Sequence, residues 1–157
     1  MSDLQSLYQS VILDHSRSPR NKRVMTDASH RAAGRNPMCG DEVTVWLRVD
    51  GDTVADVSFV GQGCAISQAS ASLMPQVLKG KSRADAEALF ERFHALVTGR
   101  LAVTEVDDTL GRLVALGGVS RFPSRVKCAS LAWHAMHAAL AKSAESSEPA
   151  EPTVSTE

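Results

Sequence analysis

The sequence predicts an α+β fold, in which helices pack on one face of a small, mainly antiparallel sheet. Two observations lead to this class. Residues 43–59 contain two runs of alternating apolar and polar side chains joined at Asp50-Gly51, a pattern typical of a half-buried β-hairpin. Four other stretches have apolar residues at helical spacing. Since a two-stranded hairpin is marginally stable alone, we expect these amphipathic helices to cover its apolar face.

The first helix is predicted over residues 3–16. Its apolar positions recur three and four residues apart, at Leu4, Leu7, Tyr8, Val11 and Ile12. Ser18-Pro19 ends this pattern. Residues 17–36 hold five arginines and little periodicity. We therefore expect an irregular segment there, with a solvated basic surface as the favoured interpretation and a docking face for an acidic partner as the alternative.

The two strands and the second helix follow one another directly. The alternating apolar residues are Val43, Val45, Leu47 and Val49 before the turn, and Ala55, Val57 and Phe59 after it. Gly61-Gln62-Gly63 ends the second strand, and Cys64 opens a helical pattern. Pro75 lies inside this pattern, so we expect it to kink or split the helix.

The C-terminal half is predicted to contain two more helices. One follows the capping residue Ser82, and the last spans residues 124–142. Residues 99–123 between them show only a short apolar stretch. Residues 142–157 carry four Glu and one Lys without apolar periodicity, so we expect a disordered acidic tail. The predicted organisation is one folded domain over residues 1–141 followed by this tail.

The composition argues against two classes of partner. A net charge of −1 gives no strong attraction to nucleic acid or to an anionic membrane surface. No apolar run approaches the roughly 18 residues of a membrane span, and no basic segment followed by an apolar stretch opens the chain. We therefore expect a cytoplasmic protein without nucleic-acid or membrane partners. Its three widely spaced cysteines favour reduced thiols over a disulfide scaffold.

Three cysteines and one aspartate form the candidate site. Cys39 and Asp41 share the loop of residues 36–41, where a proline and a glycine favour a sharp turn. Cys64 and Cys128 stand where irregular stretches give way to helices, and a helix N-terminus favours the thiolate form of sulfur. Together the four residues supply the donors of a tetrahedral zinc site. Two other interpretations remain open from the residue types alone: cysteines that fill core space, and a redox role of the thiols without metal.

Neighbouring basic and imidazole side chains are candidates for completing this site. Arg125 and Lys127 flank Cys128 and would offset the negative charge of three thiolates and a carboxylate around one divalent ion. Their alternative role is a solvated start of the last helix. His30, His134 and His137 offer imidazole ligands, although a solvated or core-edge position is the more common fate of a histidine.

Three separated segments also carry a recognisable pattern, namely Asn36–Asp41, Gly63–Ser72 and Arg125–Leu131. Together with the opening segment 7–15, they resemble the iron–sulfur cluster assembly proteins of the SufU, IscU and NifU N-terminal family. The resemblance covers about residues 4–141. Lys127 precedes the last cysteine where the IscU branch has histidine, and a long segment over residues 80–118 comes before it. Both features are similar to the SufU branch.

The SufU resemblance implies a zinc-bound sulfur acceptor on the same α+β fold. Cys39, Asp41, Cys64 and Cys128 would hold Zn²⁺, and Cys39 would take persulfide sulfur from a PLP-dependent cysteine desulfurase of the SufS type. Downstream scaffold proteins of the SUF system would receive the sulfur. In the alternative, iron or a [2Fe-2S] cluster is assembled on the same residues and passed on. A third interpretation makes the zinc purely structural and the protein an interaction module.

Overall fold

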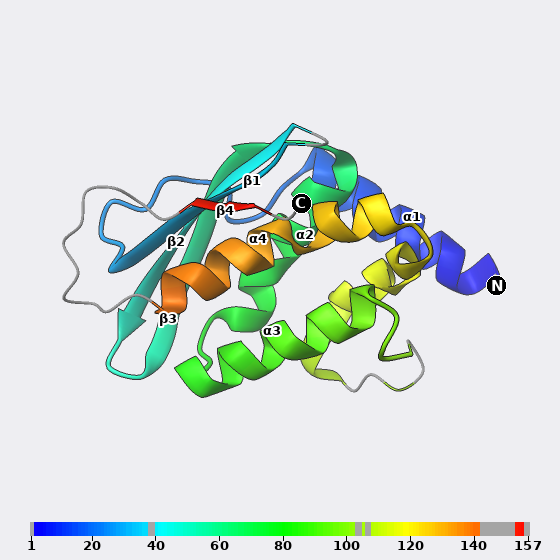
Figure 1. The fold of residues 1–157 in the computed structure, drawn as a ribbon. Helices are drawn as coiled ribbons and strands as arrows, with labels where there is room; N and C mark the ends of the chain where they lie inside the picture. The colour runs from blue at the N-terminus through cyan, green and yellow to red at the C-terminus, as the bar shows by residue number, and fades with distance from the viewer. Residues whose placement is uncertain (1, 38–39, 103–104, 106–107, 142–152, 156–157) are drawn as a thin grey trace.

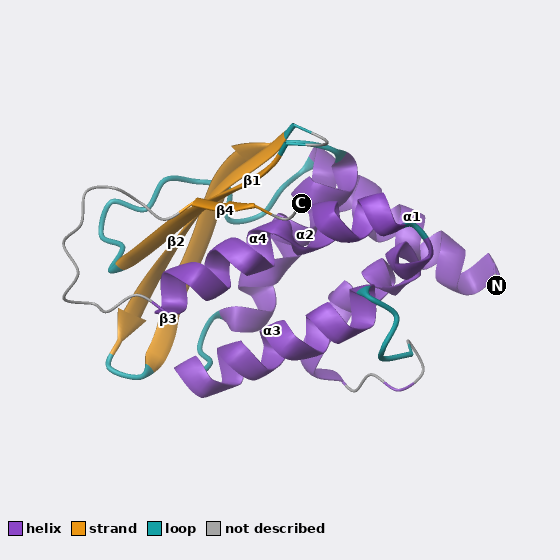
Figure 2. Ribbon diagram, viewed as in Figure 1, coloured by secondary structure: helices purple, strands orange, loops and turns teal. Residues whose placement is uncertain are grey.

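The structure is a computed structural model that describes residues 2–37, 40–102, 105, 108–141 and 153–155, with only the backbone of residues 2–8 and 153–155. The elements follow in the order α1 (Ser2–Arg17), β1 (His30–Asn36), β2 (Asp41–Asp50), β3 (Thr53–Gln62), α2 (Ala65–Leu78), α3 (Arg83–Val97), η2 (Asp108–Arg121), α4 (Pro123–Ala141) and β4 (Thr153–Ser155). The sheet has the strand order β3-β2-β1-β4. Figures 1 and 2 show the helices gathered on one side of this sheet, as predicted.

The predicted hairpin is confirmed as the antiparallel pair β2 and β3. Val45 pairs with Phe59 and Leu47 with Val57, and all four side chains are buried in the core beneath the helices. Gly51 adopts φ 62°, the left-handed conformation that a tight hairpin turn requires. Alternating apolar residues thus place one face of each strand against the helices.

The segment from 17 to 36 was predicted to be irregular throughout, and this is wrong for its second half. Residues His30–Asn36 form β1, which pairs antiparallel with β2. Inward positions of β1 are occupied by small or polar residues, because α4 packs closely there: a Cβ on Gly34 would lie 3.0 Å from Leu131 Cδ1. Pairing with β2 therefore forms a strand that the pattern of apolar residues does not predict.

Helix α2 is the central helix of the fold, and almost all of its residues are buried. It packs against α1, α4 and β3. Pro75 does not split it, because the helix continues through Leu78 and the N–H of Lys79 still donates to the carbonyl oxygen of Pro75 at 3.1 Å. A buried polar contact joins α1 to α2, where His15 Nδ1 lies 2.7 Å from Ser72 Oγ.

Helix α4 packs on β1 and β2 beside α2, and α3 packs against α4 and η2. Ser82 caps α3 as predicted, since its hydroxyl oxygen accepts a hydrogen bond from the N–H of Asp85 at 3.0 Å. The weakly patterned region contains the 3₁₀ segment η2. Phe93 of α3 stacks on Trp133 of α4 with ring centroids 4.8 Å apart, which fixes α3 against α4.

The acidic tail was expected to lack regular structure. Thr153–Ser155 instead form the short strand β4, which pairs in parallel with β1. An unpaired sheet edge offers backbone donors and acceptors, and threonine and valine favour extended structure, so this pairing has a physical basis. Residues 142–152 and 156–157 lie outside the described residues, so the expectation for them stays a prediction.

Candidate metal centre

Asp41 is the first residue of β2 and the best anchored member of the site. Its side chain is fully buried, and its Oδ1 accepts a hydrogen bond from the backbone N–H of Cys64 at 3.0 Å. Gly63 makes room for the carboxylate, because a Cβ at that position would overlap it and lie 2.9 Å from its Cγ. The turn between β3 and α2 is thus shaped around this carboxylate.

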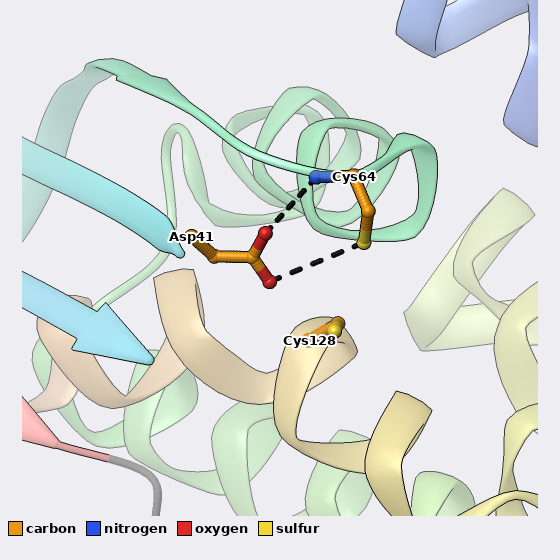
Figure 3. A group of neighbouring side chains, drawn as sticks. All are labelled: Asp41, Cys64 and Cys128. Atoms are coloured by element: carbon orange, nitrogen blue, oxygen red, sulfur yellow. Dashed lines mark hydrogen bonds between the residues drawn. The ribbon is translucent and has the colours of Figure 1, made fainter. Parts of the chain in front are cut away.

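Cys64 caps the N-terminus of α2, at the helix start that the sequence predicts. Its extended backbone lets the sulfur accept a hydrogen bond from the N–H of Ser67 at 3.4 Å. The same sulfur lies 4.0 Å from Asp41 Oδ2, within the range of a weak S–H···O contact. The turn between β3 and α2 thus positions both ligand candidates, because Cys64 belongs to it and the Cys64 N–H binds the Asp41 carboxylate (Figure 3).

Cys128 approaches this pair from α4 and is fully buried. It is the sixth residue of a helix that starts at Pro123, so it lies near the predicted helix start but in the second turn. Its sulfur faces the carbonyl oxygen of Ser124 at 3.6 Å, which is the usual acceptor one turn earlier in a helix. The argument from helix-terminal N–H groups therefore applies to Cys64 and not to Cys128.

The side chains of Asp41, Cys64 and Cys128 point toward one another from three different elements (Figure 3), and their ligand atoms all lie within 4.8 Å of one another. In tetrahedral zinc sites with Zn–S of about 2.3 Å and Zn–O of about 2.0–2.2 Å, neighbouring donors lie about 3.4–3.8 Å apart. A contraction of roughly 1 Å would bring these atoms to that spacing. Two sulfurs and one carboxylate oxygen also match the donors that zinc accepts.

A positive side chain faces the two sulfurs. Negative charge on Cys64, and next that on Cys128, raises the pKa of the Arg125 guanidinium, and hydrogen bonds to both sulfurs act in the same direction. Arg125 is otherwise exposed, in the first turn of α4. Lys127 is half-buried and, within the described part of the chain, forms no hydrogen bond or ion pair with these residues. Of the two predicted supporting residues, the structure brings only Arg125 to the cluster.

Cys39, the remaining predicted ligand, lies outside the described residues. The loop that carries it is closed at its base, because Asn36 pairs with Asp41 and the N–H of Gly40 donates to the carbonyl oxygen of Asn36 at 2.9 Å. Cys39 is two residues from Asp41, and two residues of extended chain span at most about 7 Å.

None of the considered histidines joins the described cluster. His30 lies at the start of β1, paired with Leu47 toward the other end of the sheet. His134 and His137 pack on Phe90 of α3, with ring centroids 5.4 and 4.5 Å from it. Their positions fit the interpretation of core-edge residues. The supporting contacts of Gly63 and Ser67 were not predicted, although the glycine-flanked turn was the signal that pointed to them.

Comparison with known proteins agrees with this geometry. The model of the NifU-like N-terminal domain family matches residues 7–148. The chain belongs to this family. A relative from Bacillus subtilis, named zinc-dependent sulfurtransferase SufU, is 44% identical over 137 residues, covering 86% of this chain and 90% of the relative. A relative from Streptococcus pyogenes, named iron–sulfur cluster assembly scaffold protein IscU, is 38% identical over 136 residues, covering 87% and 84% of the two chains.

A solved structure from Fervidobacterium islandicum, described as an iron–sulfur cluster assembly scaffold protein for the SUF system (FiSufU), has the same fold. It superposes with a TM-score of 0.77 at 34% identity and covers 86% of this chain and 97% of the solved one. These matches confirm the predicted resemblance to the SufU, IscU and NifU family, whose members act in iron–sulfur cluster assembly. No helix among the described residues of this family member is long and apolar enough to cross a membrane.

Proposed function

We propose that the protein is a zinc-dependent sulfur acceptor of iron–sulfur cluster assembly, with Cys39, Asp41, Cys64 and Cys128 as ligands. The convergence of Asp41, Cys64 and Cys128 is the observation that carries this proposal. The name of the 44% identical relative supports zinc over other metals. Zinc, when bound, keeps its cysteine ligands deprotonated and binds them in a redox-inert centre.

Cys39 is the sulfur-accepting residue in this proposal. Cys64 is held as the cap of α2, and Cys128 is fully buried in α4. Cys39 instead belongs to a short loop between paired residues of β1 and β2. A reactive thiol must reach the sulfur donor of a partner, and loops provide this access more readily than a buried helix position.

The transfer is a thiol exchange in which no net oxidation or reduction takes place. The Cys39 thiolate attacks the outer sulfur of a persulfide carried by the donor cysteine. The sulfur–sulfur bond of the donor breaks, a new sulfur–sulfur bond forms on Cys39, and the donor cysteine leaves as a thiolate. Arg125 supplies a positive charge beside Cys64 and Cys128, which offsets the negative charge that accumulates in the centre.

The donor in this proposal is a PLP-dependent cysteine desulfurase of the SufS type, and the recipients are downstream SUF scaffold proteins. The protein would then act as a sulfurtransferase-like carrier that stimulates the desulfurase by removing its persulfide sulfur. We also infer a supporting role for Lys127, which is half-buried and directly precedes Cys128 in the chain.

Two measurements test the function. Elemental analysis of the purified wild type should give about one zinc per chain, with less zinc in Cys39→Ala, Asp41→Ala, Cys64→Ala and Cys128→Ala. Mass spectrometry after incubation with desulfurase and cysteine should then find one added sulfur on the peptide that contains Cys39. Cys39→Ala should accept no sulfur, whereas Gly118→Ala, which keeps all four ligands and has nothing within 4 Å of its added Cβ, serves as a control. Transfer at the wild-type rate by Cys39→Ala would exclude Cys39 as the acceptor.

A scaffold function is the second candidate, and the 38% identity to a relative named as a scaffold protein is the observation that favours it. The same thiolates and carboxylate could bind iron with sulfide. A coloured protein that contains iron and sulfide in equal amounts would establish this candidate. A colourless protein with one zinc, and without stimulation of a desulfurase, would point to the structural role of the metal.

A further inference from the structure

The two edges of the sheet are covered in different ways. On β3, the N–H of Phe59 donates to the carbonyl oxygen of Asn21 at 3.1 Å, and the N–H of Val54 donates to that of Lys81 at 2.8 Å. The segments around Asn21 and Lys81 thus cover the outer edge of β3. On the outer edge of β1, β4 is the only described segment that pairs with it. Among the described residues, closure of this edge therefore depends on β4 alone.

The register of β4 places it beside the metal centre. Ser155 pairs with Arg35, and the next residue of β1, Asn36, pairs across the sheet with Asp41. Two strand spacings of about 4.8 Å separate β4 from β2, so β4 ends roughly 10 Å from the backbone of a proposed ligand. Figure 1 shows β4 alongside β1.

The pairing of β4 has the features of a reversible contact. Within the described residues it involves three pairs, fewer than in a typical strand, and it is parallel. It also lies beyond residue 148, the last residue that the family model matches. The open edge of β1 offers backbone donors and acceptors, which favours docking of β4 within the same chain.

We propose that β4 is a displaceable strap that closes the outer edge of β1 beside the metal centre. The second half of the proposal rests on the proposed function: a partner that approaches the metal centre gains access to this edge when the strap leaves. The partner chemistry that fits is an extended segment whose backbone adds a strand to β1. β4 and the extended segment of the partner thereby compete for the outer edge of β1.

Amide hydrogen exchange of the full-length protein tests the strap directly. The amides of Ala33–Arg35 that do not bond to β2 should be protected in the wild type. Val154→Pro should make these amides exchange at least tenfold faster, since proline lacks an N–H and disrupts the middle of the strand. Val154→Thr keeps a β-branched residue and should preserve protection. Ala150→Pro places the same proline outside β4 and should also preserve it.

Binding to the desulfurase tests the competition quantitatively. If the strap is open for a fraction of the time, the apparent affinity of the partner is reduced by that fraction. The protection factor lost in Val154→Pro should therefore equal the factor by which the dissociation constant for the desulfurase falls. A tenfold loss of protection predicts a tenfold tighter complex, and Ala150→Pro should bind like the wild type.

Three results would overturn the proposal. Equal exchange at Ala33–Arg35 in the wild type and in Val154→Pro would show that β4 does not close this edge. Protection that rises with protein concentration would assign the strand to a second copy of the chain. Lost protection with unchanged binding would show that partner and strap do not compete. Failure of the proposed function has a separate signature, because neither the wild type nor any variant would then bind the desulfurase, and only the exchange result would support the strap.

Discussion

Replacing Gly63 by alanine is the most direct test of how the centre is built. The added Cβ would overlap the Asp41 carboxylate, 2.9 Å from its Cγ. Because Asp41 is fully buried, the carboxylate can relieve this overlap only by giving up its hydrogen bond from the N–H of Cys64. A hydrogen bond to a charged group contributes about 1.5–3 kcal/mol, and overpacking costs about 1–3 kcal/mol. These costs are alternatives, so we expect a loss of about 1–3 kcal/mol of folding stability.

Metal binding should respond more strongly than stability. Loss of a group that orients a ligand lowers metal affinity by about 10–100-fold. Competition with a chromophoric chelator measures the affinity, and urea unfolding of the metal-free protein measures the stability. Gly118→Ala is the matched control, because nothing lies within 4 Å of its added Cβ. Wild-type affinity and stability in Gly63→Ala would refute the fit between this turn and Asp41.

A double-mutant cycle sharpens this test. In the Asp41→Ala background the carboxylate that the new Cβ meets is gone, so Gly63→Ala should cost less than about 0.5 kcal/mol more. An undiminished cost in that background would mean that the alanine acts through the backbone of the turn, and would remove Asp41 from the explanation.

Three further predictions concern stability. Burial lowers the pKa of His15 and of His134 below 6.5, so the unfolded chain binds more protons than the folded protein below that pH. The free energy of unfolding should therefore fall as the pH drops from about 7 to 5, by up to about 1.4 kcal/mol per pH unit for each proton. An unchanged urea midpoint at pH 5 would contradict this. Ser82→Ala should cost about 1 kcal/mol through loss of the α3 cap, whereas Ser82→Asp should restore most of it; equal unfolding midpoints for both variants would refute the cap. Gly34→Ala should cost about 1–3 kcal/mol, since the new Cβ would lie 3.0 Å from Leu131 Cδ1, and a stabilised variant would show that α4 adjusts freely.

The sequence predicts the elements whose signal is local. Alternation around Asp50-Gly51 identifies the hairpin, and helical spacing identifies all four α-helices. The start of α2 at Cys64 is also predicted, because the preceding glycines end a strand and the following residues repeat at helical spacing. These signals are strong because each one is complete within about a dozen residues.

What escapes prediction depends on contacts between distant segments. The inward positions of β1 lack large apolar residues because α4 lies close to Gly34, and a short-range pattern does not contain this information. The second-turn position of Cys128 likewise follows from a helix that begins at Pro123. For the site, residue types supply the candidates, but only the fold shows that Gly63 and the Cys64 N–H position the carboxylate.

The three described ligand candidates come from the start of β2, the start of α2 and the second turn of α4. An unfolded chain separates Asp41 from Cys128 by 87 residues (128 − 41) and offers no preformed cluster. An ion held by all three therefore binds the folded state alone, and each tenfold excess over its dissociation constant adds about 1.4 kcal/mol to stability. Metal occupancy then becomes a readout of folding, so a destabilising substitution far from the centre should lower the metal content of the protein once an appreciable fraction of the metal-free chain is unfolded.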